Sequence, residues 1–303
     1  MTRAAQDRFG SLAQVRAWYA EELRFAGPVE SEAVVRAFAS VPRERFLGPG
    51  PWRIHDDARR GGYRTTPDAD PRHVYHNVLV ALDETRRINN GSPSLWAFAL
   101  DQLGVAAGEA VLHVGCGTGY YSAILAELAG AGGHVVAVEQ HPDLAARARA
   151  ALADWPQAAV VEADGAAFSA GPRDVIVASA GATHPLPGWL ESLRPGGRLL
   201  FPLTSQRLGG FMLKVTRSRA GQRLPADLLC RAWFIPFTGA RDAALDERLA
   251  MAIDGGHSDL VRSLRLDRHV PDGSCWLHGG GFCLSWRDPD PADGAPADAR
   301  RPP

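Results

Sequence analysis

The sequence predicts an α/β fold built on a doubly wound, mostly parallel β-sheet. From residue 111 onward, short apolar runs typical of buried strands alternate with helical patterns, as expected for parallel βαβ units. A glycine-rich turn, GCGTG at 115–119, joins the first of these runs to a helical segment. Acidic residues end the next two runs. Because ligands bind α/β sheets at the carboxyl ends of neighbouring strands, these observations predict a binding site there.

The elements expected before residue 111 are short. Ser31 is positioned to cap a helix, SEAVVRAFASV, which should stop before Pro42 because proline disfavours a helical residue in front of it. The segment 47–73 is rich in Pro, Gly and Asp and should be mostly loop. Ser92 followed by Pro93 predicts the first turn of a further helix.

Beyond residue 111 the expected elements alternate in type. Strands are expected at 111–114, 134–139, 158–164 and 174–180, and within LRPGGRLLFPL and GFMLKVTR. Helices are expected at YYSAILAEL, from Pro142 and at ARDAALDERLAMAI, and CWLHGGGFCLSW predicts a terminal strand or hairpin. The predicted organisation is an N-terminal helical and loop segment (1–83), a ligand-binding domain (84–240), a C-terminal extension (241–288) and a disordered tail (289–303).

Composition excludes several classes of function. The 33 basic and 34 acidic residues leave a net charge of -1, which lacks the footprint of a nucleic-acid or membrane-surface binder. No apolar run approaches the ~18 residues of a spanning helix, and the start lacks a signal-peptide core, so we expect a cytoplasmic protein. We also expect a monomer. The cysteines, Cys116, Cys230, Cys275 and Cys283, are scattered, and the histidines show no ligand spacing, so no metal site is expected.

The glycine turn predicts a nucleoside site without phosphates. Gly115, Gly117 and Gly119 follow a strand, where glycine permits positive φ and lets a ligand approach the backbone. The spacing is GxGxG, and Tyr120 stands where a dinucleotide-binding loop needs its last glycine. No phosphate-loop motif is present either.

Two acidic residues complete the predicted cofactor site. Glu139 ends the second strand about 20 residues past the glycines, where a carboxylate can accept hydrogen bonds from both ribose hydroxyls. Asp164, followed by Gly165, ends the third strand and is placed to accept a proton from an adenine amine. A solvated strand-end carboxylate and a turn residue remain the alternatives for these two positions.

These residues resemble a known family. VLHVGCGTGYYSAILAEL, then VVAVE and EADG, is similar to class I S-adenosylmethionine methyltransferases. VPRERF at 41–46, LRPGGRLLFPL at 193–203 and RAWFIPFTGA at 231–240 narrow the resemblance to protein-L-isoaspartate O-methyltransferases. The resemblance implies a Rossmann-like class I methyltransferase fold, with a seven-stranded sheet, a reversed final strand and helices on both faces. It also implies S-adenosyl-L-methionine as cofactor and isoaspartyl residues of proteins or peptides as acceptors.

The acceptor loop departs from that family. The family carries a Thr-Ile-Ser-Gln-Pro loop facing the methyl-transfer site, and Pro93 matches its proline. Asn89 and Asn90 then stand at its Thr and Ile positions, and Gly91 takes the Ser position. Ser92 takes the Gln position. We hypothesise that Asn89, Asn90 and Ser92 jointly replace the missing hydroxyl as the catalytic set, because amides can orient a carboxylate; turn formation and helix capping are the alternatives.

The expected chemistry depends on the acceptor. A carboxylate is already anionic at neutral pH, so the enzyme would align it and exclude water without a general base. A hydroxyl or amine acceptor would make His184 the leading base. A related O-methyltransferase acting on a small molecule or a dedicated biosynthetic peptide stays open, favoured by Gly91 and by residues 241–287. An NAD-linked oxidoreductase, which Tyr120 disfavours, and an inactive donor-binding module are further alternatives.

Overall fold

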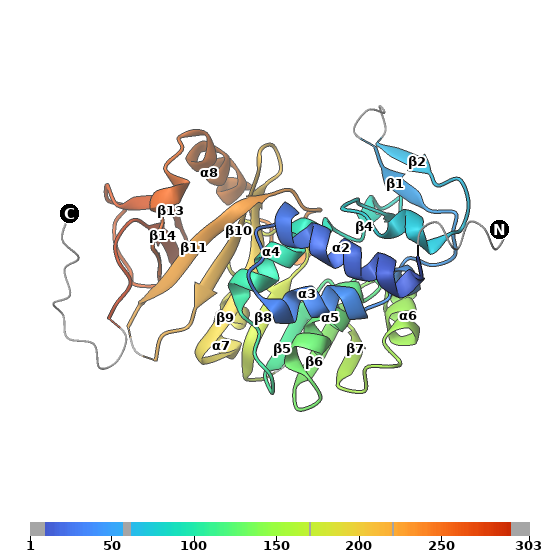
Figure 1. Cartoon of the computed structure of the whole chain (residues 1–303). Helices are drawn as coiled ribbons and strands as arrows, with labels where there is room; N and C mark the ends of the chain where they lie inside the picture. The colour runs from blue at the N-terminus through green and yellow to red at the C-terminus, as the bar shows by residue number, and fades with distance from the viewer. Residues whose placement is uncertain (1–9, 57–61, 170, 220, 292–303) are drawn as a thin grey trace. The chain divides into compact units, whose positions relative to one another are not determined.

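The computed structural model describes residues 10–56, 62–169, 171–219 and 221–291, and the chain divides into two compact units, 1–165 and 166–303 (Figure 1). No helix within those described ranges is long and apolar enough to cross a bilayer. Unit 1 contains, in order, α2 (Leu12–Ala26), α3 (Glu32–Ser40), the 3₁₀ turn η1 (Arg43–Phe46), β1 (Arg53–His55), β2 (Tyr63–Thr65), η2 (Pro71–Val74), β3 (Ala81–Asp83), β4 (Ile88–Asn89), α4 (Pro93–Leu103), β5 (Ala110–Val114), α5 (Tyr120–Ala129), β6 (His134–Glu139), α6 (Pro142–Ala151) and β7 (Ala158–Glu162).

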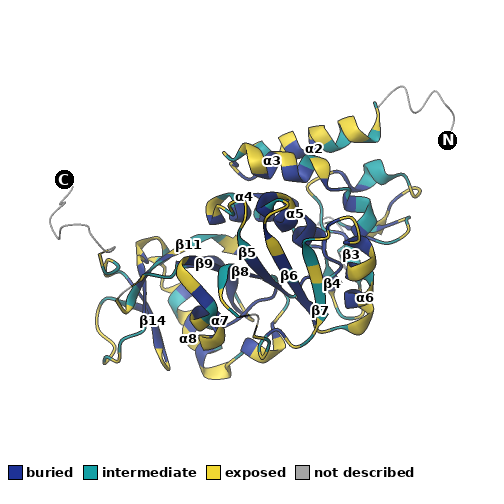
Figure 2. Cartoon of the chain, turned by 90° about the horizontal axis from the view of Figure 1, so that it is seen from below, coloured by how far each residue is buried: buried dark blue, intermediate teal, exposed yellow. Residues whose placement is uncertain are grey.

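The parallel strands β5, β6 and β7 form the centre of unit 1. Val111 pairs with Val135 and Val136 with Ala159, in the parallel register expected for βαβ units. Most of the apolar residues of β5 and β6 are buried, as Figure 2 shows for these strands. Helix α5 is buried along nearly its whole length because it packs against these strands and against α3. The predicted strand 134–139 and the helix starting at Pro142 are confirmed.

The N-terminal part of unit 1 agrees with the sequence in its helices and differs in its loop. The Ser31 side chain accepts a hydrogen bond from the Val34 amide at 3.4 Å, and α3 ends before Pro42 as predicted. The segment predicted to be mostly loop contains the antiparallel pair β1–β2. Ile54 explains this difference, because its side chain is buried and it pairs with Val80 far along the chain, a contact invisible to local sequence patterns.

Unit 2 begins with a parallel pair and continues in antiparallel order. It contains β8 (Arg173–Ala178), α7 (Pro187–Ser192), β9 (Leu193–Ser205), β10 (Gly209–Thr216), β11 (Arg223–Ala232), η3 (Thr238–Ala240), α8 (Ala243–Asp254), η4 (Ser258–Leu260), β12 (Ser263–Arg265), β13 (Cys275–Gly279) and β14 (Phe282–Ser285). β8 pairs with β9 in parallel, whereas β9, β10 and β11 run antiparallel, side by side in Figure 1. Tight connections such as the one between β9 and β10 permit only antiparallel neighbours. The predicted α/β fold is thus a mixed sheet architecture with a parallel core.

The C-terminal extension is folded within unit 2. β12 pairs with β11 and β14, and β14 forms a hairpin with β13, as predicted for CWLHGGGFCLSW. The segment predicted to be a disordered tail begins at residue 289, and residues 292–303 lie outside the described part. Before that point Asp290 is bound to Arg223, with 2.6 Å between the carboxylate and guanidinium.

Candidate active site

The glycine turn between β5 and α5 adopts the conformation that its sequence predicts. Gly115, Gly117 and Gly119 have φ values of 71°, 58° and 93°, a region that other residues rarely occupy. A side chain at Gly119 would also approach Leu152 to 3.0 Å, whereas a Cβ at Gly117 would meet nothing closer than Leu82 at 3.7 Å. The backbone of the turn therefore stays uncovered at Gly117, where a ligand can reach it.

Glu139 holds this turn from the end of β6. Its side chain is 5% exposed, and Oε2 accepts a hydrogen bond from the Gly117 amide at 2.8 Å. The other oxygen, Oε1, accepts from the His141 amide at 3.0 Å. A buried carboxylate needs such donors to offset its lost hydration. Each oxygen has further lone-pair capacity, so the group can still accept hydroxyl hydrogen bonds.

Asp164 and Gly165 lie beside Glu139. They follow β7, and the Ala163 amide donates to the Glu139 backbone carbonyl at 3.1 Å, which joins the ends of β6 and β7. Asp164 is exposed and Gly165 is buried. The structure thus brings the predicted cofactor-binding residues to adjoining ends of parallel strands, as the strand order required.

The predicted catalytic residues, by contrast, have different local roles. Asn90 is 7% exposed, and its side-chain oxygen accepts hydrogen bonds from the Val80 amide at 3.0 Å and from Arg43 at 3.3 Å. The Asn89 oxygen accepts from the Gly91 amide at 2.9 Å, which forms a turn. Asn90 is therefore anchored in the interior, while Asn89 is only partly buried.

Ser92 stands at the start of α4 without capping it through its hydroxyl. Its backbone carbonyl accepts from the Trp96 amide at 3.1 Å, but its side chain makes no capping hydrogen bond. The hydroxyl lies 3.5 Å from that of Ser94, at the limit of a hydrogen bond. The predicted helix start is confirmed, and the hydroxyl of Ser92 is available to a ligand.

Sequence reasoning missed Arg43, which organises the loop in front of Asn90. The Arg43 side chain is fully buried and donates to the backbone carbonyls of Val74, His76 and Val78 at 2.5, 2.9 and 2.6 Å. These contacts fold residues 74–78 around one guanidinium, and the bond to Asn90 extends this arrangement to the acceptor loop. The VPRERF motif marked this region, but nothing in the sequence distinguishes the buried Arg43 from Arg45, two residues further along.

Gly91 has no room for the serine hydroxyl that its family position carries. Its φ is 75°, and a Cβ there would lie 2.7 Å from Trp96 Nε1 and 3.2 Å from Tyr121. The Trp96 and Tyr121 rings stack at 4.8 Å, and the Tyr121 hydroxyl donates to the Gly91 carbonyl at 3.3 Å. This packing excludes any side chain at position 91.

We therefore expect Gly91→Ser to destabilise the protein. Strain from the positive φ and overpacking against Trp96 should together cost about 2–4 kcal/mol of unfolding free energy. Chemical denaturation measures this loss. Gly104→Ser is the matched control, because its φ is 63° but a Cβ there meets nothing within 4 Å; an equal loss in both variants would contradict the packing argument.

Burial keeps several titratable residues near the strand ends neutral. Burial lowers the pKa of His113 to about 3, and its Nδ1 lies 2.7 Å from the Ser122 hydroxyl. Burial and the charge of Glu139 raise the pKa of the Cys116 thiol, which keeps it protonated. In unit 2, burial lowers the pKa of His184, whose Nδ1 lies 3.0 Å from the Thr183 hydroxyl. His184 is thus neutral at pH 7.

Two of the cysteines that are scattered in the sequence lie close together in the fold. In unit 2, Cys275 and Cys283 gather with His269 and His278, and one ligand atom of each residue lies within 4.8 Å of the others. The sequence did not show this because the four residues have no usual ligand spacing and meet only when β13 pairs with β14.

Two solved structures share the fold of this chain. A protein-L-isoaspartate O-methyltransferase covers 85% of this chain and 73% of its own at 20% identity, with a TM-score of 0.55. The beta-aspartate methyltransferase (PCMT) of Plasmodium falciparum, solved with S-adenosyl-L-homocysteine, covers 74% of this chain and 98% of its own at 16% identity, with a TM-score of 0.59. The chain belongs to the protein-L-isoaspartate(D-aspartate) O-methyltransferase (PCMT) family, whose model matches residues 17–242.

Sequence relatives agree with this membership. The protein-L-isoaspartate O-methyltransferase 1 of Anaeromyxobacter sp. (strain Fw109-5) is 33% identical over 217 residues, which are 70% of this chain and 91% of that protein. The protein-L-isoaspartate O-methyltransferase of Aeropyrum pernix is 33% identical over 227 residues, 72% of this chain and 77% of that protein. The chain is an S-adenosylmethionine-dependent methyltransferase of the PCMT type.

Proposed function

We propose that this protein transfers a methyl group from S-adenosyl-L-methionine to the free carboxylate of an isoaspartyl residue in a protein or peptide. The observation that carries the proposal is the buried Glu139 carboxylate fixed against the uncovered glycine turn. The Glu139 carboxylate can accept hydrogen bonds from the ribose hydroxyls of the donor, and the glycine turn leaves backbone beside it that the donor can approach. The absence of a phosphate-loop motif in the sequence agrees with a donor that carries no phosphate.

The donor would lie along the ends of β5, β6 and β7. Gly115, Gly117 and Gly119 would contact the donor through their backbone, and Glu139 would accept hydrogen bonds from the ribose hydroxyls. Asp164 and Gly165, next to Glu139, would receive the adenine amine. The sulfonium itself activates the methyl group, so the residues of the chain need only bind and orient it.

On the acceptor side, Ser92 and Asn89 are the groups that would touch the substrate carboxylate. Both are partly buried, and the Ser92 hydroxyl is not used to cap α4. Asn90 would act as a positioning residue, since its oxygen is committed to Val80 and Arg43. A carboxylate needs no deprotonation at pH 7, so this loop need not supply a base.

A second candidate function keeps the donor and changes the acceptor. The crowded Gly91 removes the family's hydroxyl, and the family match ends at residue 242, before most of the predicted extension 241–288. These two observations favour a dedicated biosynthetic peptide or a small molecule over damaged proteins in general. We further propose that residues 84–240 act as the methyltransferase domain and that the protein is a cytoplasmic monomer. The cytoplasm is a compartment in which the free thiols of this chain would stay reduced.

The experiment compares three acceptors with a labelled donor: an isoaspartyl peptide, its aspartyl isomer and the same peptide with asparagine at that position, which lacks the free carboxylate. Methylation of the isoaspartyl peptide alone is the expected result. Ser92→Ala should lower kcat/KM about 10-fold or more, the effect of one lost hydrogen bond to a charged group, whereas Ser94→Ala should leave it within a factor of two. Binding of S-adenosylhomocysteine without methylation of any of these peptides would favour the second candidate.

A further inference from the structure

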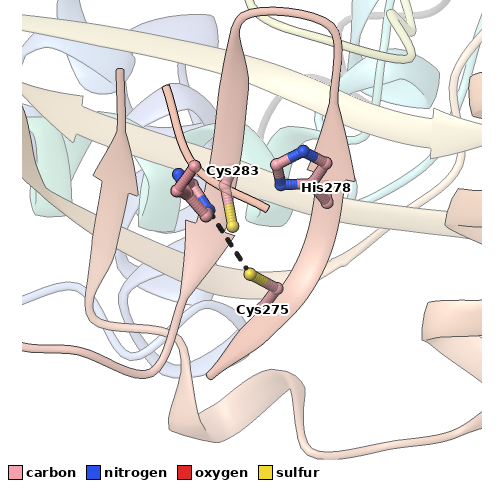
Figure 3. A group of neighbouring side chains, drawn as sticks. Cys275, His278 and Cys283 are labelled. Atoms are coloured by element: carbon pink, nitrogen blue, oxygen red, sulfur yellow. Dashed lines mark hydrogen bonds between the residues drawn. The ribbon is translucent and has the colours of Figure 1, made fainter. Parts of the chain in front are cut away.

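The cluster in the C-terminal extension combines side chains from a loop and a hairpin. Cys275 and His278 lie on β13, Cys283 lies on β14, and His269 lies in the loop before them. Figure 3 shows Cys275, His278 and Cys283 pointing toward one another, and its dashed line marks the contact between Cys275 Sγ and His269 Nε2 at 3.5 Å. One ligand atom from each residue lies within 4.8 Å of the other three.

A β-bulge puts the two ligands of β13 on one face. Side chains three positions apart on a regular strand point to opposite faces. Here Cys275 pairs with Ser285 and Leu277 with Leu284, so Trp276 is an extra residue in β13. The bulge restores Cys275 and His278 to the same face, where His278 pairs directly with Cys283. Bulges commonly re-aim a side chain at a functional site.

His269 is oriented by a neighbouring acid. Its Nδ1 lies 3.0 Å from the Asp267 backbone carbonyl and 3.3 Å from the Asp267 carboxylate. A proton on Nδ1 leaves the lone pair on Nε2, the atom that faces Cys275. Metal-binding histidines typically donate their other ring N–H to a carboxylate or carbonyl in this way.

The surroundings of the cysteines and His278 also suit a cation. Cys283 is fully buried, and the Asp272 amide donates to Cys275 Sγ at 3.4 Å. Nδ1 of His278 is buried and makes no hydrogen bond within the described residues. A buried ring nitrogen without a partner costs free energy unless something binds it.

Arg265 contacts the two aspartates that lie next to His269 and Cys275. It is 6% exposed, pairs with Cys283 across β12 and β14, and contacts Asp267 at 2.7 Å and Asp272 at 3.5 Å. The same two aspartates contact His269 and Cys275, so one ion-pair network surrounds the ligand group. Outer hydrogen bonds of this kind fix ligand orientation in metal sites.

We propose that His269, Cys275, His278 and Cys283 bind a structural zinc ion. Tetrahedral zinc with Zn–S of about 2.3 Å and Zn–N of about 2.0–2.1 Å places its ligand atoms roughly 3.3–3.8 Å apart, and the 3.5 Å contact already lies in this range. Small side-chain rotations close the remaining separations. Two thiolates and two neutral imidazoles are the ligands zinc takes in structural sites. Binding would release two thiol protons, and four protein ligands leave no position for substrate.

The test measures the metal content of full-length protein, purified with a reductant and without a polyhistidine tag. The expected result is about one zinc per chain, with at least a five-fold loss in Cys275→Ser and His278→Ala. Cys230→Ser is the matched control, because Cys230 is a partly buried thiol on β11 outside the cluster, and it should retain the zinc. A strong chelator should release the metal, expose two further reactive thiols and lower the melting temperature.

Replacing zinc with cobalt in the wild-type protein tests the same site even if the variants do not fold. Zinc-depleted wild-type protein given Co²⁺ should show thiolate-to-cobalt charge transfer and the visible bands of tetrahedral cobalt. The proposal would be overturned if the purified protein contained no zinc and also showed none of these bands after cobalt addition. Zinc that persists in folded Cys275→Ser and His278→Ala would also overturn it, because the ion would then lie elsewhere. A Cys275–Cys283 disulfide whose reduction restores no metal binding would do the same.

Discussion

Glu139→Gln is expected to weaken the binding of S-adenosylhomocysteine by about 100-fold or more. Hydrogen bonds to a charged acceptor contribute about 1.5–3 kcal/mol each, and in our proposal Glu139 accepts two from a ribose, so the loss would be about 3–6 kcal/mol. The amide group would also turn a donor toward the Gly117 or the His141 N–H, which now donate to the carboxylate. Isothermal calorimetry with the purified protein measures the affinity.

Glu162→Gln is the matched control for this prediction. Glu162 pairs with Glu139 across β6 and β7, but it is exposed and its nearest cation, Arg149, lies 3.9 Å away. Its loss should change the affinity by less than about two-fold, as expected for an exposed ion pair. Unchanged affinity in a folded Glu139→Gln protein would mean that the ribose does not use this carboxylate, and the proposed donor position would be wrong.

Arg43→Met is expected to lower the free energy of unfolding by about 3–5 kcal/mol, because the buried guanidinium is the donor to several acceptors and each buried acceptor left unsatisfied costs about 1–3 kcal/mol. Methionine fills most of the space but donates nothing, so the carbonyls of Val74, His76 and Val78 lose their donor inside the protein. Denaturant unfolding followed by fluorescence measures the change.

Arg45→Met tests whether this effect is specific. Arg45 lies two residues away in the same 3₁₀ turn, where it pairs with the exposed Asp154. We expect its replacement to leave stability unchanged within error, because exposed ion pairs contribute little. Arg43 also contacts Asn90 in the acceptor loop. We therefore expect a folded Arg43→Met protein to show a raised KM for the acceptor and a smaller change in its affinity for the methyl donor. Equal stability of both variants would remove Arg43 from its proposed role.

Much of unit 1 was predictable because its signals are local. Strand 134–139 is continuously apolar from Val135 up to its acidic end, and Pro142 can occupy only the first turn of the helix that follows. The glycine turn was recognisable because positive φ at Gly115, Gly117 and Gly119 demands that residue. The placement of Glu139 beside the turn then followed from parallel strand order, since the ends of neighbouring strands meet at one edge.

The sequence by itself therefore determined the α/β class, the family and the edge of the sheet where a nucleoside would lie. Only the tertiary structure decided that Asn90 is an interior anchor, that Gly91 is crowded by Trp96 and Tyr121, and that His269 joins the ligands of the β13–β14 hairpin. The physical reason is the range of the contacts. Helix and turn signals act over a few neighbouring residues, whereas buried hydrogen bonds and ligand clusters depend on segments that meet only after folding.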